Sequence, residues 1–241
     1  MKRKLLTGIV TLTVCISMFA ATNMCIKLED GQIVKYDVEN VVEVYYETNI
    51  NDTTPPLIDS FIVDASETSL EFRFLSDTTA EVAKGDQDLD TLNIPSKVRI
   101  DGKVYKVTSI GYAAFSNCSS LASITIPEGV TSIGDHVFEE CTSLASITIP
   151  EGVTIIGFST FSGCSKLASI TIPKSVKSIE SFAFASCTNL ASITIPESVT
   201  YIGSRAFSNC KNLDVVIENS KENVEIEDSS FPGWKSVTYT K

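Results

Sequence analysis

The chain has 241 residues, 43% of them hydrophobic, and a formal net charge of −11 at pH 7. Such a hydrophobic fraction excludes a chain that is disordered throughout, so we expect a packed core. The excess of carboxylates excludes the basic surface on which nucleic-acid binding depends, so we expect no nucleic-acid partner.

Residues 1–21 are expected to be a secretory signal peptide. Basic residues at positions 2–4 precede an apolar run, Leu5–Ala21, that contains no carboxylate. This order is typical of such a signal, and the small residues at its end offer a cleavage site. We therefore expect an exported protein, either on the cell surface or extracellular. A lipid anchor on Cys25 is the alternative, although the bulky Met24 before it is unusual for lipidation.

Residues 22–60 are expected to form a leader in front of the main domain. The segment Ile33–Tyr46 is typical of a small β-hairpin. The segment Thr53–Pro56, which contains two prolines, is typical of a linker.

Residues 61–107 are expected to form an N-terminal cap. Within them, Leu70–Phe74 and Ala80–Val82 are strand candidates. Asp101 and Gly102 predict a two-residue turn between two further strands.

The same cap contains alternating carboxylates at Asp86, Asp88 and Asp90, which is how a calcium-binding loop begins. The sixth position of that loop is Thr91 instead of glycine, and the twelfth is Lys97 instead of glutamate. We expect a solvated acidic loop, with calcium binding as the alternative.

A 23-residue repeat extends over residues 108–213. The heptapeptide Leu-Ala-Ser-Ile-Thr-Ile-Pro begins at Leu121, Leu144, Leu167 and Leu190. Four other residue types recur with the same period. They are Val130, Val153, Val176 and Val199; Ile133, Ile156, Ile179 and Ile202; Phe138, Phe161, Phe184 and Phe207; and Cys141, Cys164, Cys187 and Cys210.

One such unit cannot bury its apolar residues alone, whereas stacked units can. Ile124 and Ile126 alternate with polar residues, as a short strand with one buried face requires, and the proline ends the strand. The sequence therefore predicts a β-rich repeat solenoid with a 23-residue period and β-rich caps.

A glycine follows the second recurring isoleucine at Gly134, Gly157 and Gly203, and glycine suits a tight corner. Glu180 replaces it in one unit, which leaves the backbone conformation there open.

Residues 214–241 are expected to form a divergent last repeat and cap. Leu213–Glu218 departs from the strand pattern, and Phe231 and Trp234 take the places of the phenylalanine and the cysteine. Carboxylates gather in this segment, as expected of a solvated end. They are Glu218, Glu222, Glu225, Glu227 and Asp228.

Periodic cysteines in an exported protein raise the question of disulfides or zinc. Each cysteine takes the same place in its unit, and a zinc site would need four ligands that converge on one point. We expect buried free thiols, no metal site and no cofactor.

We also expect no enzyme. The only histidine, His136, and Cys141 are the only candidates for a Cys–His nucleophilic pair. The chain contains no phosphate-binding glycine-rich loop, zinc-protease helix motif or nucleophile elbow.

Binding residues must then lie where the core does not fix the sequence. The outward positions of the strands form uniform rows of hydroxyls, which suit a repetitive ligand. These rows are Ser123 and Thr125, Ser146 and Thr148, Ser169 and Thr171, and Ser192 and Thr194.

The variable corner after the second isoleucine instead carries residue types that are enriched in binding hot spots. They are Tyr112, His136, Phe158, Phe182 and Arg205, with Tyr201 nearby. We expect this stripe to contact a protein partner, although its rings could equally pack over the corners as structural residues.

The full pattern, Leu-x-x-Ile-x-Ile-Pro-x-x-Val-x-x-Ile-Gly-x-x-x-Phe-x-x-Cys, resembles the BspA-like, or treponemal-class, leucine-rich repeat proteins. The resemblance is close over residues 92–213 and looser over residues 61–241. It implies a solenoid on a microbial cell surface that adheres to host matrix proteins or to other cells. The alternative is a structural or glycan-binding surface component, and the sequence leaves the ligand, the anchor and the oligomeric state open.

Overall fold

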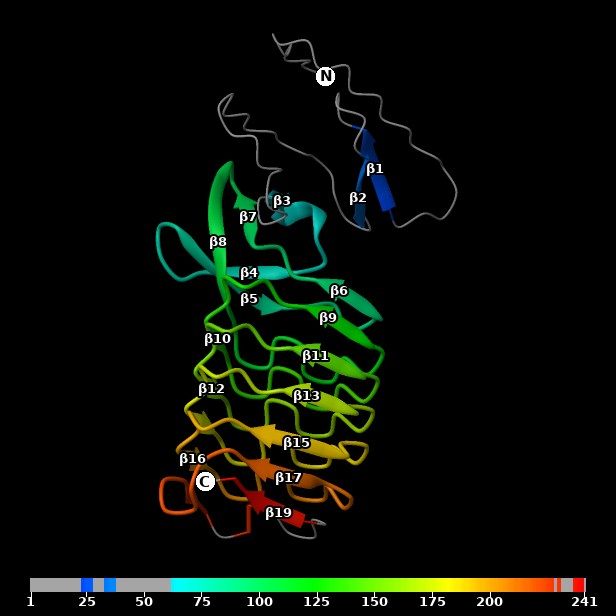
Figure 1. Ribbon diagram of the computed structural model, residues 1–241. Coiled ribbons are helices and arrows are strands. Elements are labelled where there is room, and N and C mark those ends of the chain that lie inside the picture. Colours follow the sequence, from blue (N-terminus) through cyan, green and yellow to red (C-terminus); the bar gives the residue numbers. More distant parts are fainter. Residues whose placement is uncertain (1–22, 28–32, 38–61, 228, 231–235, 241) are drawn as a thin grey trace, which may run out of the picture. The chain divides into compact units, whose positions relative to one another are not determined.

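A computed structural model describes residues 23–27, 33–37, 62–227, 229–230 and 236–240 (Figure 1). The chain divides into two compact units, residues 1–42 and 43–241. In the first unit, β1 (Asn23–Lys27) and β2 (Ile33–Asp37) pair as antiparallel strands. The expected signal peptide lies outside the described residues, as do the positions after 37 in the expected hairpin.

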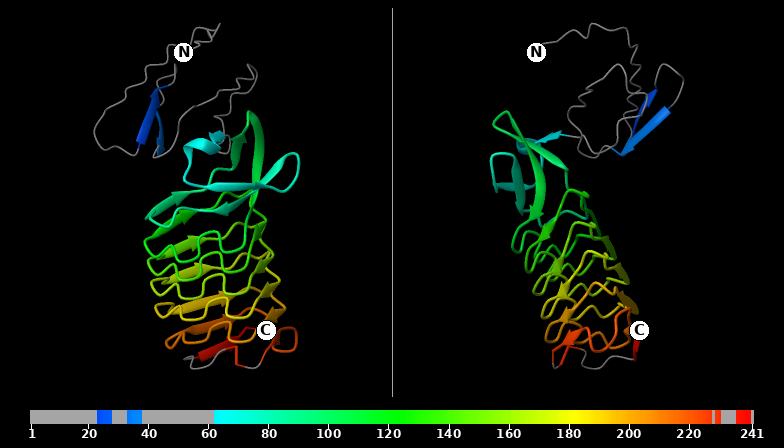
Figure 2. Two further views of the ribbon diagram at one scale, coloured as in Figure 1. Left: turned by 180° about the vertical axis from the view of Figure 1, so that it is seen from behind. Right: turned by 60° about the vertical axis from the view of Figure 1, so that its left-hand side comes forward.

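The repeats of the second unit form stacked coils, and two sides of each coil carry short strands (Figures 1 and 2). The strands on the first side are β9 (Ser123–Thr125), β11 (Ser146–Thr148), β13 (Ser169–Thr171), β15 (Ser192–Ile195), β17 (Asp214–Ile217) and β19 (Ser236–Tyr239). Those on the second side are β10 (Ser132–Ile133), β12 (Ile155–Ile156), β14 (Ser178–Ile179), β16 (Tyr201–Ile202) and β18 (Glu225–Ile226).

Paired strands are parallel and join equivalent residues of neighbouring coils. Ile147 lies opposite Ile170, and Ile156 lies opposite Ile179. One 23-residue unit is therefore one coil, and the β-rich solenoid predicted from the period is confirmed.

The third side of each coil consists of turns that bond to the next coil. The backbone N–H of Phe138 donates to the carbonyl of Thr160 at 2.8 Å, and that of Phe161 donates to Ala183 at 2.8 Å. Two residues per coil have positive φ, for example His136 (59°) and Glu140 (57°). A non-glycine residue in this region costs about 1–2 kcal/mol, and the bonds between coils help to offset that cost.

A stack of phenylalanine rings runs through the core, one ring per coil. The rings belong to Phe115, Phe138, Phe161, Phe184 and Phe207, all at most 1% exposed. Neighbouring ring centroids are 5.3–5.7 Å apart and the ring planes are within 11° of parallel. The phenylalanine ring of each coil is therefore buried by the rings of the neighbouring coils, as expected of a solenoid core.

The N-terminal cap continues into both sheets of the solenoid. Its elements are β3 (Ile62–Asp64), η2 (Ala65–Glu67), β4 (Glu71–Phe74), β5 (Thr79–Lys84), β6 (Thr91–Asn93), β7 (Lys97–Ile100) and β8 (Lys103–Ile110). The end of β8 pairs with β10, and β6 pairs with β9.

The predicted cap strands and the predicted turn are confirmed. β4 and β5 form an antiparallel pair, as do β7 and β8. Asp101 (φ 51°) and Gly102 (φ 78°) connect β7 to β8 with the two positive φ values that a type I′ turn requires.

At the other end, β17, β18 and β19 extend both sheets. The irregular sequence after Leu213 thus still forms strands in register with the preceding coils. Asp228, Phe231 and Trp234 lie outside the described residues.

At Gly134 and Gly203 glycine is favoured by close packing between coils and not by positive φ. A Cβ on Gly203 would lie 2.5 Å from the Ser181 nitrogen, and one on Gly134 would lie 2.9 Å from the Tyr112 nitrogen. At Glu180, where the glycine is missing, β14 keeps its register with both neighbouring strands. The backbone conformation that the sequence left open is therefore the regular one.

Candidate functional site

The corner residues singled out from the sequence form one continuous column, which we call the corner column. It consists of Tyr112, His136, Phe158, Phe182 and Arg205, one from each of five successive coils. Successive ring centroids are 5.3, 5.1 and 5.6 Å apart. The guanidinium carbon of Arg205 lies 5.7 Å from the centroid of the Phe182 ring, so a cation–π contact ends the column.

From Tyr112 to Phe182 the column alternates between two positions of the corner, and Arg205 then repeats the position of Phe182. Tyr112 and Phe158 occupy the first position after the corner glycine, whereas His136, Phe182 and Arg205 occupy the second. In every coil the other position holds a smaller residue. These smaller residues are Ala113, Asp135, Ser159, Ser181 and Ser204.

Large side chains at the first position, Tyr112 and Phe158, therefore lie two coils apart, although the core repeats every coil. Strands in neighbouring coils lie about 4.8 Å apart, so Tyr112 and Phe158 are separated by about 9.6 Å along the stack. Tyr112 is 69% exposed and Phe158 39%, whereas the His136 side chain between them is 22% exposed. Two projecting rings therefore flank a lower one.

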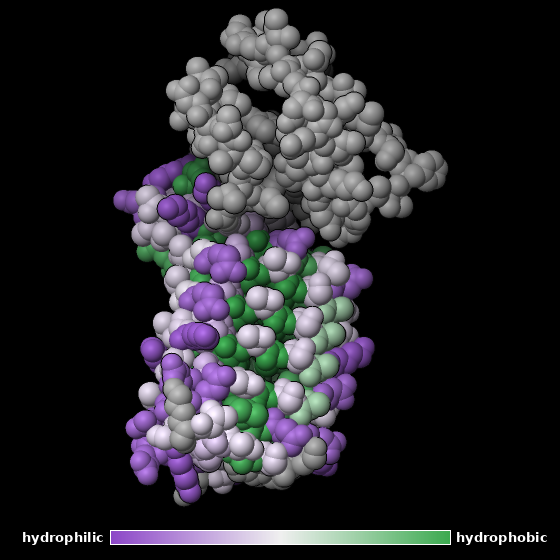
Figure 3. Space-filling model, in the orientation of Figure 1, coloured by the Kyte–Doolittle hydropathy of each residue, from purple (hydrophilic) through white to green (hydrophobic). Residues whose placement is uncertain are grey.

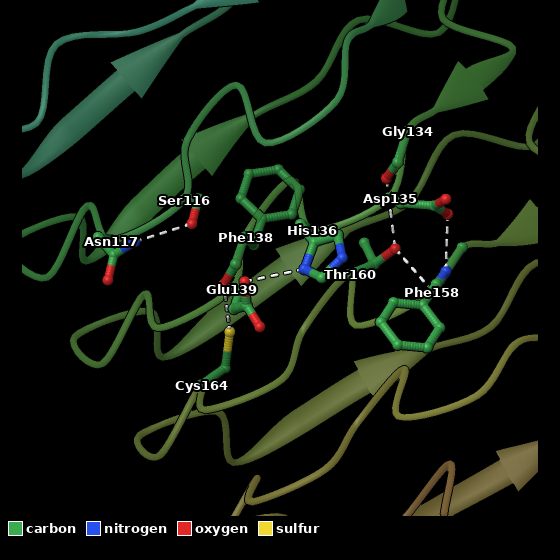
Figure 4. A network of polar contacts seen from close by, with 11 residues as sticks. Ser116, Asn117, Gly134, Asp135, His136, Phe138, Glu139, Phe158, Thr160 and Cys164 are labelled. Atoms are coloured by element: carbon green, nitrogen blue, oxygen red, sulfur yellow. Dashed lines mark hydrogen bonds and ion pairs between the residues drawn. The ribbon is translucent and has the colours of Figure 1, made fainter. Parts of the chain in front are cut away.

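Carboxylates lie beside the middle of the column, as Figure 4 shows. Nδ1 of His136 is 2.8 Å from Oε2 of Glu139. Oδ1 of Asp135 accepts a hydrogen bond of 2.8 Å from the Phe158 backbone N–H. Both carboxylates belong to the same coil as His136, so the segment between the two projecting rings is acidic.

Tyr201 does not belong to this column. It lies in β16, on the neighbouring side of the coil, and its O–H donates to Oε1 of Glu227 at 2.6 Å. This hydrogen bond raises the pKa of the Tyr201 phenol to about 12. The structure thus separates Tyr201 from the other corner residues with which the sequence grouped it.

The hydroxyl rows lie on the first side of the coils, as expected. In β9, β11 and β13 the serine and the threonine are exposed and the isoleucine between them is buried. Ser146 pairs with Ser169 and Thr148 with Thr171, so equivalent hydroxyls follow one another along the stack. Figure 3 shows this side as green and pale columns, with purple residues mainly at its margins.

This strand face carries no charge in four successive coils. Each heptapeptide from leucine to proline lacks lysine, arginine, aspartate and glutamate. The face thus differs from the corner column both in chemistry and in its one-coil period.

The five cysteines of the repeats lie in the core as free thiols, as predicted. Sγ of Cys141 donates to the carbonyl of Phe115, and Sγ of Cys164 donates to that of Phe138, both at 3.1 Å. Burial raises the pKa of the Cys141 thiol to about 12 and that of Cys210 to about 11. Such thiols are poor nucleophiles and poor metal ligands at neutral pH.

Several other chemical possibilities find no support in the described part of the chain. His136 bonds to Glu139 while Cys141 bonds to Phe115, so the only candidate nucleophilic pair is not formed. Within the described ranges, no three histidine, cysteine, aspartate or glutamate side chains are placed to hold a metal ion, and this includes Asp86, Asp88 and Asp90. No helix among the described residues has the length and apolar character to cross a membrane.

Asp135 and Glu139 lie beside the corner column although the sequence alone did not indicate them. A comparison of residues 46 positions apart would have indicated the two-coil pattern, because Tyr112 aligns with Phe158 and His136 with Phe182 at that spacing.

Comparison with known proteins agrees with this architecture. A family model described as the BspA type leucine rich repeat region matches residues 107–238 in six copies. A leucine-rich repeat protein from Bacteroides ovatus ATCC 8483 is 41% identical with a TM-score of 0.58, and the match covers 62% of this chain and 41% of that one.

Two further structures are similar. A leucine rich cell surface protein from Faecalibacterium prausnitzii A2-165 is 30% identical with a TM-score of 0.59, over 71% of this chain and 53% of that one. The leucine rich repeat protein of T. pallidum is 28% identical with a TM-score of 0.55, over 66% of this chain and 83% of that one. The chain therefore spans only about half the length of the first two proteins, and no curated protein matches it.

Proposed function

Because the chain belongs to the BspA-type leucine-rich repeat family, we propose that it is a binding module on the surface of a bacterial cell. Its partner is a protein of a host matrix or of another cell surface, and it catalyses no reaction. The description of the similar Faecalibacterium protein as a cell surface protein supports the location.

The observation that carries this proposal is the corner column. Neither corner position needs a large side chain, since the second position holds Ala113 or Ser159 in some coils and the first holds Ser181 in another. Aromatic side chains are nevertheless placed in successive coils, and two of them are exposed, Tyr112 at 69% and Phe158 at 39%. Aromatic side chains and arginine are enriched at protein–protein interfaces, and tyrosine and arginine are among the residues that contribute most to binding.

The proposal is tested with a triple variant, Tyr112→Ala, Phe158→Ala and Phe182→Ala, assayed against a panel of immobilised matrix proteins. We expect the full chain to bind at least one of them and the triple variant to bind it at least about tenfold more weakly. The matched control is Ile155→Ala, which removes a side chain that is 50% exposed on the neighbouring side of a coil. Equal binding by the triple variant would contradict the proposal.

A second candidate function rests on the uncharged strand face. Regular rows of small hydroxyl side chains suit a neutral, repetitive ligand, so the chain is alternatively a glycan-binding or structural component of the surface. A glycan array with the purified chain tests this, together with the variant Thr148→Lys and Thr171→Lys, which places charges in the rows. Glycan binding that is lost in the lysine variant and kept in the triple corner variant would favour this second function.

A further inference from the structure

The corner column has a spacing that selects among the shapes of a protein ligand. The exposed rings of Tyr112 and Phe158 project from the same corner position, two coils and about 9.6 Å apart. A ligand that follows the stack and contacts both rings must present equivalent side chains at that distance.

Among the regular backbones, the polyproline II helix comes nearest to this distance of about 9.6 Å. A polyproline II helix has three residues per turn and rises about 3.1 Å per residue, so its residues i and i+3 are about 9.3 Å apart on one face. A β-strand repeats about every 6.7 Å, which matches neither one coil nor two. Two turns of an α-helix span about 10.8 Å, a poorer match.

The chemistry of the two rings fits the same ligand. Proline-rich segments bind to grooves lined by aromatic side chains, and they lose little conformational entropy because the polyproline II helix is already formed. The lower ring of His136 lies between the projecting rings of Tyr112 and Phe158, so the column offers two ridges and a floor.

Charge further specifies the ligand. Glu139 is held beside the His136 ring, and Asp135 is held against the backbone of Phe158 (Figure 4). A basic residue next to the prolines would therefore meet carboxylates between the two rings.

From this geometry we propose that the corner column binds a proline-rich segment in the polyproline II conformation. Prolines three residues apart stack on Tyr112 and Phe158, and an adjacent arginine or lysine meets the carboxylates of the intervening coil. This inference rests on the proposed function and specifies which part of the protein partner is recognised.

The experiment measures binding of fluorescent peptides to the full chain by fluorescence polarisation. The first peptide has two prolines separated by two residues, in a proline-rich frame with one flanking arginine. The second is identical except for one additional residue between the two prolines, which moves them out of register. A collagen-like triple-helical peptide of Gly-Pro-Pro triplets and an amphipathic helical peptide of equal charge complete the set.

We expect the first peptide to bind, and the out-of-register peptide to bind at least about tenfold more weakly. Tyr112→Ala and Phe158→Ala should each weaken the first peptide by a similar factor, whereas Tyr112→Phe and the control Ile155→Ala should not. Glu139→Gln should weaken it severalfold, and less so at high salt, where charge attraction is screened. Binding of the collagen-like peptide as well would also support the inference, because each chain of a collagen triple helix has a conformation close to polyproline II.

Equal affinity for the two spacings, preference for the helical peptide, or affinity unchanged in Tyr112→Ala and Phe158→Ala would each overturn the inference. If a matrix protein binds through the corner column and no proline-rich peptide binds, this inference fails while the proposed function stands. If the matrix protein binds equally to the triple corner variant, the proposed function fails.

Discussion

The recurring cysteine illustrates how one residue type fits the interior of this solenoid. Each thiol is small enough for the core. From Cys141 onward, each thiol donates a hydrogen bond to the backbone carbonyl of the phenylalanine in the preceding coil. A serine would bring a more strongly hydrated hydroxyl into the same place, and alanine would leave space and an acceptor without its donor. The neutral thiol is therefore the form that stabilises the fold.

We expect stability to fall in alkaline solution because of these thiols. Burial raises the pKa of the Cys164 and Cys187 thiols well above the ordinary value of 9.0. Above pH 9 the unfolded chain loses these protons while the folded chain keeps them, so the stabilisation present below pH 9 is lost progressively as the pH rises above 9. Each thiol contributes up to about 1.4 kcal/mol of lost stability per pH unit in this window.

Urea unfolding between pH 7 and pH 10.5 measures this effect. The double variant Cys164→Ala and Cys187→Ala is the comparison, because it removes two of the titrating groups and leaves the lysines and tyrosines in place. The variant should be less stable at pH 7 and should lose stability less steeply above pH 9. Parallel curves for the two proteins would contradict the prediction.

The residues of the corner column could be predicted from the sequence, but the contacts between them could not. Its members were identified from the sequence, but their contacts were not, because successive members are 24, 22, 24 and 23 residues apart. An alignment at the 23-residue period places them in two different columns. The rings contact one another between neighbouring coils although they start from different corner positions. The 23-residue period does not predict such contacts.

Each side of a coil has its own way of joining to the next coil. Two sides use strand pairs of two to four residues. The third side uses hydrogen bonds between turns, and two residues in each of these turns have positive φ. The strand of the first side could be predicted from Ile124 and Ile126, whose alternation has the strand period. The turn side could not, because its ten left-handed positions are mostly residues without a strong preference for that conformation. They are Ala113, His136, Ser159, Phe182, Arg205, Asn117, Glu140, Gly163, Ser186 and Asn209.

Two phenylalanines of one turn side provide a matched test of its packing. Phe161 is fully buried in the ring stack, whereas Phe158, three residues earlier, is 39% exposed in the corner column. Phe161→Ala should lower the free energy of unfolding by about 3–5 kcal/mol, since it removes a ring that contacts rings in both neighbouring coils. Phe158→Ala should lower it by less than about 1 kcal/mol.

Urea unfolding followed by circular dichroism measures both changes. A similar loss in the two variants would indicate that the corner column is part of the structural core. It would also remove the basis for using Phe158→Ala as a binding variant.

At the scale of the whole solenoid, stability is a sum over coils and the contacts between them. The Leu-Ala-Ser-Ile-Thr-Ile-Pro repeats predicted this one-dimensional arrangement directly. The exact heptapeptide does not mark the end of the solenoid, because Asp214-Val215-Val216-Ile217 lacks it and still pairs with β15 and β19, in the segment expected to be a divergent repeat. Burial of Leu213, Val215 and Ile217 is what the stack requires, and hydrophobic residues other than the consensus meet that requirement.

Removal of one whole coil should therefore leave a folded protein. Deletion of residues 144–166 joins Ser143 to Leu167 and restores the repeat, so we expect a β-rich circular dichroism spectrum and one cooperative transition. The free energy of unfolding and its dependence on urea should both decrease, because less surface is buried.

The control is a deletion of residues 144–154, about half a coil, which shifts strands against turns and should abolish cooperative unfolding. Loss of folding in the whole-coil deletion, or a stable fold in the half-coil deletion, would contradict an additive stack.

From Tyr112 to Phe182 the corner column distinguishes odd from even numbers of coils, because its large side chains alternate there between the two corner positions. The phenylalanine stack makes no such distinction, since each ring packs only on the rings of the neighbouring coils. Loss of one coil between Tyr112 and Phe182 would place two side chains of the same corner position next to each other, whereas loss of two coils would restore the alternation. Removal of a single coil would therefore change the outer surface of this stretch while leaving the pattern of its interior intact.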